Sequence, residues 1–215
     1  MANSKQAGVK RLSMTERAQQ QKDLHFPSVP DPWLWHRKSN DGFTTVPRTL
    51  PLVMQAVDAK SKGQPAGHTL FCLWARSPDH PLLSIENPST FATEAGFVGE
   101  RAVDTWRKRM RCLRDLNLIV TKPGGSGEFH YVLLLNPNTA MEWMRVSAPN
   151  GVSDAIYARF LDRLAEVGAM GDLHAVRELW AAQNAAAAAE APPPPPPPST
   201  TPEAAPAASA IDSLL

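Results

Sequence analysis

The sequence predicts an α+β fold organised around residues 89–132, and three observations support this prediction. Apolar residues recur at helical spacing over 100–116, which predicts a long amphipathic helix. A shorter helical stretch precedes it, and glycines that favour a tight turn separate the two. Two apolar stretches flank a glycine-rich loop further along, which predicts a β-hairpin. This order of elements is that of a winged helix-turn-helix domain.

The short helix is expected to begin at Ser89 or Thr90, because either hydroxyl can cap a first turn. Gly96 is expected to end it in the left-handed conformation, which glycine adopts without strain. Gly99 then allows a close approach of the backbone before the next helix begins.

The long helix over 100–116 has an apolar face and a basic face. Its apolar residues are three or four positions apart and predict a buried stripe of Val103, Trp106, Met110, Leu113 and Leu116. Six basic and three acidic residues give this helix a net charge of +3. The hairpin is expected to consist of strands at 118–120 and 129–135, joined by a loop at 123–127.

The stretch GFVGERAVDTWRKRMRCLRDLNLIVTKPG, residues 96–124, resembles the DNA-binding half of bacterial winged helix-turn-helix proteins. It also resembles the winged-helix segments of plasmid and phage replication or maintenance proteins. The shared pattern is a small residue in the turn, a basic helix and a Leu-x-x-Leu-x-Leu-Ile run into the hairpin. Residues 42–48 and the helix after them fit the comparison, which covers roughly 33–137. The resemblance implies binding to double-stranded DNA.

In such a complex the long helix is expected to enter the major groove. Base edges are then expected to be contacted by Arg101, Thr105 and Lys108. Phosphate contacts are expected from Arg107, Arg111 and Lys122 and from the glycine-rich tip, Gly124, Gly125 and Ser126. An alternative stays open, because a basic helix is often only a solvated face and some winged helices contact proteins. The hairpin itself is only moderately basic, since Glu128 opposes Lys122 and His130.

The N-terminal region is polar and then rich in proline. Residues 1–25 are basic and are expected to form a disordered arm, with a marginal helix capped by Ser13 or Thr15 as the alternative. The prolines of 26–35 exclude a regular helix there. Trp33 and Trp35 are expected to pack on the core as a strap, rather than to stack on bases.

Residues 26–148 are expected to form the winged-helix domain. Before the basic helix, the sequence predicts a short β-run at 43–46, a helix at 50–62 capped by Thr49, a buried helix at 66–77 and a strand at 81–87 that pairs with the hairpin. After the hairpin it predicts a turn at 136–138, a helix at 139–146 whose Trp143 closes the core, and a boundary at 149–151.

Residues 152–184 are expected to form a helical hairpin broken at 168–171, with Asp172 capping its second helix. Such a hairpin is too small to bury its own apolar faces, so it is expected to form a homodimer contact or to dock on the winged helix. Residues 185–215 are expected to be a disordered Ala/Pro-rich tail, with prolines at 192–198. Its final apolar residues, Ile211, Leu214 and Leu215, are either a hook for a protein partner or without function.

The sequence shows no motif typical of an enzyme active site or a metal site. There is no phosphate-binding glycine loop before a helix, no nucleophile elbow and no His or Cys at metal-ligand spacing, so no catalytic residue, metal or cofactor is expected. Cys72 and Cys112 lie in unlike settings and suit a reducing cytoplasm rather than a disulfide framework. No 18-residue apolar run exists that would predict a membrane span.

The net charge of +1 is unevenly distributed. Residues 1–25 carry +3 and residues 33–147 carry +4, whereas residues 148–215 carry −5. This asymmetry suits a nucleic-acid surface at one end of the chain and a protein contact or solubilising tail at the other. The expected role is that of a bacterial transcriptional regulator. The alternatives are a plasmid replication or maintenance protein, and a protein-interaction adaptor that does not bind DNA.

Overall fold

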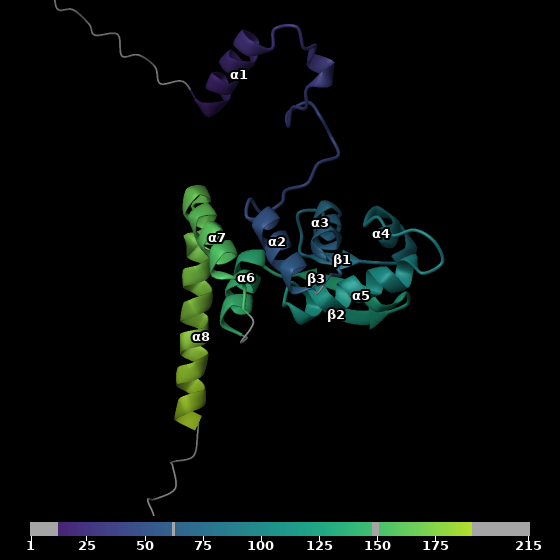
Figure 1. Cartoon of the computed structure of the whole chain (residues 1–215), viewed down its shortest axis with the longest axis vertical. Helices are drawn as coiled ribbons and strands as arrows, with labels where there is room; N and C mark the ends of the chain where they lie inside the picture. Colours follow the sequence, from purple (N-terminus) through teal and green to yellow (C-terminus); the bar gives the residue numbers. More distant parts are fainter. Residues whose placement is uncertain (1–12, 62, 148–150, 191–215) are drawn as a thin grey trace, which may run out of the picture.

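The computed structural model describes residues 13–61, 63–147 and 151–190. In these residues it has an α+β fold, with eight α-helices and one three-stranded antiparallel sheet. Helices α2 to α6 and the sheet form the body of the molecule, and α7 and α8 pack along one flank (Figure 1). Helix α1 stands apart from the body at the end of an irregular connector (Figure 1).

The sheet consists of β1 (Leu82–Ser84), β2 (Ile119–Gly124) and β3 (Gly127–Leu134), in the order β1-β3-β2. The expected pairing of the strand within 81–87 with the hairpin is confirmed, with Leu82 opposite Leu133 and Leu83 opposite Val132. The predicted loop at 123–127 was too long. Gly124 pairs with Gly127, so only Gly125 and Ser126 form the turn.

Helices α4 (Pro88–Glu94) and α5 (Ala102–Asp115) precede the β2–β3 hairpin. Neither Ser89 nor Thr90 caps α4, which corrects the prediction. The cap is Asn87, whose side chain accepts a hydrogen bond from the Ser89 amide at 3.0 Å. Proline at the first position of α4 has no amide proton to satisfy, which suits a helix start. Gly96 has φ +84°, which confirms the expected left-handed residue after α4.

The apolar stripe of α5 lies in the core, as expected. Trp106, Met110 and Leu113 are buried, and Val103 and Leu116 are partly buried against the same cluster. The Trp106 ring lies 6.3 Å from the ring of Phe91 on α4 and 5.8 Å from that of Phe129 on β3. These three rings join the two helices and the hairpin, so the opposite face of α5 must point outward.

Helices α2 (Leu50–Lys60) and α3 (Gly67–Ala75) complete this part of the core. Thr49 precedes α2, but its side chain does not cap the helix as predicted. Its hydroxyl donates to Asn138 Oδ1 at 2.6 Å. A Cβ on Gly67 would lie 2.9 Å from Cβ of Met54, so glycine is required where the two helices approach each other.

Helix α6 (Pro137–Val146) begins at the Asn136 cap and packs Met141 and Met144 into the core. The prediction for Trp143 was only partly right, because this side chain is half-buried and packs at the edge of the core. The C-terminal helices are α7 (Asp154–Val167) and α8 (Met170–Glu190). Helix α8 begins before Asp172, which therefore does not cap it. Residues 185–190 belong to this helix instead of a tail.

The α7–α8 hairpin docks on its own chain. Phe160, Leu164 and Leu173 are fully buried against the main core. Beside them lies the carboxylate of Glu142 on α6, whose side chain is 5% exposed. It accepts hydrogen bonds from the Tyr157 hydroxyl and, at 2.7 Å, from Arg177 Nε. A buried carboxylate is costly without such partners, so this cluster ties α7 and α8 to α6.

Two expectations for the N-terminal region were wrong. Helix α1 (Met14–His25) occupies part of the segment expected to be disordered, which agrees with the alternative of a helix capped by Ser13. Ser13 and Glu16 form a capping box at its start. Trp33 and Trp35 do not pack on the core, since 85% and 62% of their surfaces are exposed. Trp33 ends the short 3₁₀ helix η1 (Asp31–Trp33), which lies within the irregular connector between α1 and α2.

The expected β-run at 43–46 is irregular rather than a strand, and Thr44 donates to the carbonyl oxygen of Ser77 at 2.8 Å. The expected interdomain boundary at 149–151, the proline run at 192–198 and the residues Ile211, Leu214 and Leu215 lie wholly or largely outside the described residues. Within the described ranges, no helix combines the length and the apolar character needed to cross a membrane.

Arg177→Ala is expected to lower the free energy of unfolding by about 1–3 kcal/mol, because Glu142 loses its charged partner while remaining buried. Chemical denaturation followed by circular dichroism measures this change. Arg159→Ala is the matched control, since Arg159 is an exposed arginine of α7, and it should change the stability by less than about 0.5 kcal/mol. Equal effects of both substitutions would show that the Glu142 cluster does not stabilise the docked hairpin.

Candidate nucleic-acid interface

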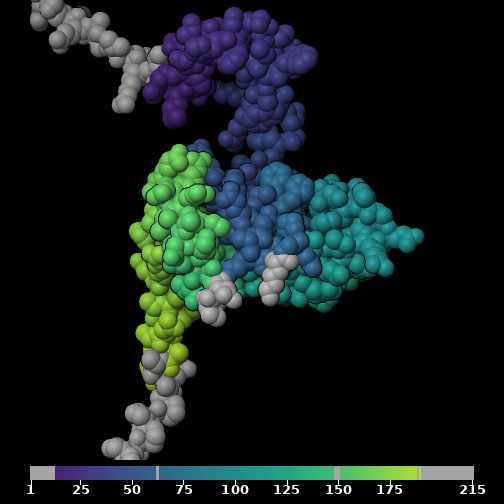
Figure 2. All heavy atoms as spheres, in the orientation of Figure 1, coloured from purple at the N-terminus to yellow at the C-terminus, as the bar shows by residue number. Residues whose placement is uncertain are grey.

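The exposed face of α5 forms a shallow basic hollow of about 400 Å³. It is lined by Arg101, Asp104, Thr105, Arg107, Lys108 and Arg111. Five of the residues expected to contact DNA are therefore brought together on one surface. This surface belongs to the teal end of the molecule, away from the α7–α8 hairpin (Figure 2).

Arg101 lies just outside α5, because the helix begins at Ala102 instead of Glu100. Arg101 and Lys108 are both exposed, and neither forms an ion pair with another described residue. Thr105 lies one turn along α5 between them and is half-buried. The cationic groups of Arg101 and Lys108 are therefore available to an anion that approaches this part of the helix.

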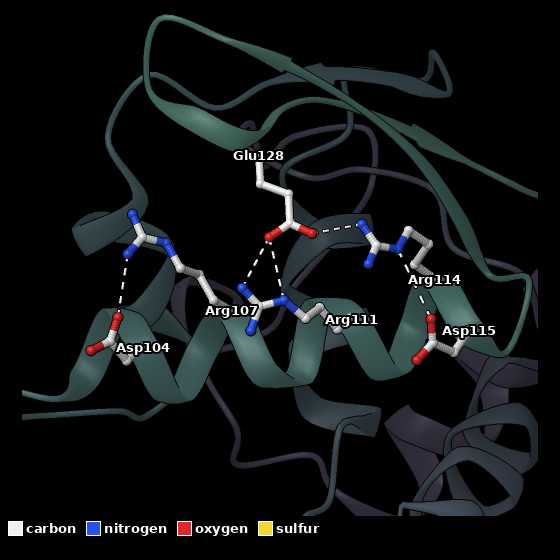
Figure 3. A network of polar contacts seen from close by, with 6 residues as sticks. All are labelled: Asp104, Arg107, Arg111, Arg114, Asp115 and Glu128. Carbon is white, nitrogen blue, oxygen red and sulfur yellow. Dashed lines mark hydrogen bonds and ion pairs between the residues drawn. The ribbon is translucent and has the colours of Figure 1, made fainter.

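The other two cations of the basic hollow are paired within the protein. Arg107 Nη1 lies 3.3 Å from Asp104 Oδ1, one turn earlier on α5. Arg111 contacts Glu128 of β3, with Nε at 3.3 Å and Nη2 at 3.0 Å from the same carboxylate oxygen. Figure 3 shows these pairs along the helix. The side chains of Arg107 and Arg111 are 38% and 48% exposed, so both pairs are partly screened by solvent.

Glu128 also binds a second arginine, which the sequence prediction did not identify. Its other oxygen accepts a hydrogen bond from Arg114 Nη1 at 2.7 Å (Figure 3). The hydrogen bond from Arg111 is the main cause that lowers the pKa of the Glu128 carboxyl, and Arg114 lowers it further. The sequence signal was limited to an acidic residue in a hairpin that follows a basic helix.

The remaining cation of α5 faces elsewhere. Arg109 Nη1 donates to Gln64 Oε1 at 2.7 Å, and its guanidinium lies 5.6 Å from the centre of the Phe97 ring. It therefore contributes to packing between α5 and the preceding segments, away from the basic hollow.

At the hairpin tip, the structure separates the exposed residues from those that pack inward. Lys122 and Gly125 are exposed. Ser126 is half-buried, and its hydroxyl donates to the carbonyl oxygen of Ile85 and lies 2.9 Å from His130 Nδ1. A Cβ on Gly124 would lie 2.3 Å from Cδ2 of His130, so this glycine makes room for the imidazole. Ser126 thus packs inward, whereas Gly124 is itself exposed and leaves space for the His130 ring.

The outer face of the sheet is a second surface, which the sequence prediction missed. Leu82, Leu133 and Val120 lie side by side across the three strands and are between 38% and 47% exposed. Together with Tyr131 and Lys122 they line an apolar hollow of about 320 Å³. The signal in the sequence was that apolar residues occupy both faces of β3. A strand with one buried face needs apolar residues on that face alone.

Neither cysteine has the features of a reactive thiol. Burial raises the pKa values of the Cys72 and Cys112 thiols, which disfavours reactive thiolates. The described residues contain no group of three or more His, Cys, Asp or Glu side chains placed to bind a metal ion.

Comparison of the chain with protein-family models, curated proteins and solved structures finds no match. Function is therefore inferred from the geometry and charge of the α5 face and the β2–β3 hairpin.

Gly124→Ala is expected to lower the free energy of unfolding by about 1–3 kcal/mol, because the new methyl group overlaps the His130 ring. Thermal or chemical unfolding measures the change. Gly125→Ala is the matched control, since a Cβ there meets nothing within 4 Å, and it should stay within about 0.5 kcal/mol of the unmodified protein. The packing of His130 on Gly124 would be contradicted by two variants of equal stability.

Glu128→Gln is expected to lower the melting temperature at pH 7 by about 1–4 °C, since it weakens two partly exposed ion pairs. The folded pKa of Glu128 is lowered, so its stabilisation is present above the ordinary value of 4.5. It is lost as the pH falls below 4.5 through the lowered pKa. Melting curves across pH should therefore converge in acid, and a pH-independent difference would contradict the ion-pair explanation.

Proposed function

We propose that the protein binds double-stranded DNA through a winged helix-turn-helix made of α4, α5 and the β2–β3 hairpin. The observation that carries the proposal is the basic hollow, which gathers Arg107, Lys108 and Arg111 of α5 with Arg101, the residue just before it. Clustered cations on one helix face are the usual electrostatic footprint of a nucleic-acid surface.

The order and packing of the elements support this proposal. A short helix and a turn precede α5, and an antiparallel hairpin follows it. Core residues occupy one side of α5, so its other side is free to meet a ligand. An α-helix with its side chains is about 10–12 Å wide, which fits the major groove of B-DNA at about 12 Å.

The available cations suggest a division of roles. Arg101 and Lys108 are unpaired among the described residues and lie with Thr105 toward the beginning of α5, where recognition helices contact base edges. Arg107 and Arg111 lie in exposed ion pairs that a phosphate can replace. Lys122 and the exposed Gly125 amide are further candidates for phosphate contact.

The biological role that we propose is transcriptional regulation. In this role the hairpin of α7 and α8 is part of the same folded unit as the DNA-binding elements. Its apolar face is already occupied by α2 and α6, so a homodimer would need a different surface.

Binding of the purified full chain to a random pool of duplex DNA tests this function. Fluorescence anisotropy at several salt concentrations is expected to give a log–log slope of about −0.9 for each phosphate neutralised, and selection from the pool should enrich one sequence. Absence of binding at low salt would overturn the proposal.

Two substitutions and one control assign the helix face. Arg101→Ala is expected to weaken binding to the enriched sequence by about 1–3 kcal/mol and to relax the sequence preference. Arg107→Ala should weaken binding to all sequences alike and make the salt slope less steep by about one. The exposed arginine of α7 provides the control, because Arg159→Ala should leave affinity unchanged. An equal loss in all three variants would mean that the α5 face is not the binding surface.

A further inference from the structure

Glu128 places a carboxylate between two arginines of the basic face. It comes from β3, whereas Arg111 and Arg114 lie nearly one turn apart on α5 (Figure 3). One oxygen of the carboxylate meets Nε and Nη2 of Arg111, and the other meets Nη1 of Arg114 at 2.7 Å. Guanidinium groups bind phosphate oxygens with the same N–H donors that they use for carboxylate oxygens.

We propose that Glu128 competes with the DNA backbone for Arg111. Its carboxylate pairs with Arg111 in the free protein, and a DNA phosphate replaces it in the complex. This inference rests on the proposed function, because it describes regulation of the same surface. It assigns to Glu128 the setting of affinity for duplex DNA of any sequence, while base recognition belongs to unpaired residues such as Arg101 and Lys108.

The pair is exposed enough to exchange. The side chains of Glu128 and Arg111 are 37% and 48% exposed, so water and phosphate can reach both. Exposed ion pairs of this kind contribute little to stability. Attachment of the hairpin to α5 has another source, since Phe129, the next residue along β3, is 3% exposed and packs on Trp106.

Arg111 is the arginine that DNA would take over. Among the described residues Glu128 is its one ion-pair partner. Arg114 has further contacts, because its guanidinium lies 5.8 Å from the Phe129 ring centre and its Nε lies 4.0 Å from Asp115. Loss of Glu128 therefore leaves Arg111 without an anion and leaves Arg114 partly anchored.

A carboxylate at this position weakens nonspecific binding in two ways. It cancels one positive charge at the surface that a DNA backbone approaches, and a phosphate must displace it before it gains Arg111. Both effects are the same for every base sequence. The ratio of specific to nonspecific affinity is then set by α5 residues that Glu128 does not touch.

Glu128→Gln in the full chain tests this inference, because glutamine keeps the shape and removes the charge. Anisotropy titrations with a random-sequence duplex are expected to show about three- to fivefold tighter binding at low salt. The salt slope should become steeper by about one, as Arg111 gains a phosphate. In the Arg111→Ala background, Glu128→Gln should tighten binding by less than it does in the unmodified chain, because no Arg111 remains to be released to a phosphate. The control is Glu166→Gln, which removes an equal charge from an ion pair on α7, and it should leave binding unchanged.

The outcomes separate this inference from the proposed function. If the unmodified protein binds duplex DNA and Glu128→Gln binds equally or more weakly, the competitor role is overturned and DNA binding stands. If neither protein binds at low salt, both proposals fail. If Glu128→Gln tightens binding and Glu166→Gln does so equally, the gain comes from net charge and the specific role of Glu128 is overturned. Circular dichroism melts confirm that each variant is folded.

Discussion

The packing of Trp106 between Phe91 and Phe129 is the contact on which the candidate interface depends. It joins α4, α5 and β3 at one point, and the Trp106 side chain is almost completely buried. Burial of a side chain this large stabilises the fold and also fixes the rotation of α5 about its own axis. Because Trp106 must face inward, the positions that follow the opposite side of the helical turn must face solvent. The exposure of the basic residues on the other face is therefore a consequence of where one aromatic residue packs.

The same logic extends to the hairpin. Phe129 and Glu128 are neighbours on β3, and the first is buried while the second reaches the arginines of α5. Packing of Phe129 against Trp106 thus positions the carboxylate of Glu128 as well. The number of cations that α5 offers to a ligand is decided jointly by its own sequence and by a residue 17 positions after Arg111. Two neighbouring residues of β3 thus act together. Phe129 packs the hairpin on α5, and Glu128 neutralises part of the charge of α5.

Local periodicity was enough to predict the elements around this contact. The three- and four-residue spacing of Trp106 and Met110 predicted the buried side of α5, and the two apolar runs predicted the hairpin. The sequence could not predict that Arg111 pairs with Glu128, because an ion pair between residues distant in sequence leaves no pattern in the sequence around them. It also could not predict the exposure of Trp33, since an aromatic residue is buried only where a complementary surface is within reach. Both errors concern contacts distant in sequence, which spacing alone does not encode.

The α7–α8 hairpin is another element whose packing partner the sequence could not predict. Its apolar spacing required that Phe160 and Leu164 be covered, yet a second copy of the chain and the body of the same chain satisfy that pattern equally well. Polar contacts distinguish the two in the structure. Glu142 on α6 is buried, so it needs donors, and Tyr157 and Arg177 supply them from α7 and α8. An apolar face can pair with many surfaces, whereas a buried carboxylate needs donors at defined positions. The apolar residues therefore provide the burial that favours docking, and the Glu142 cluster determines where the hairpin docks.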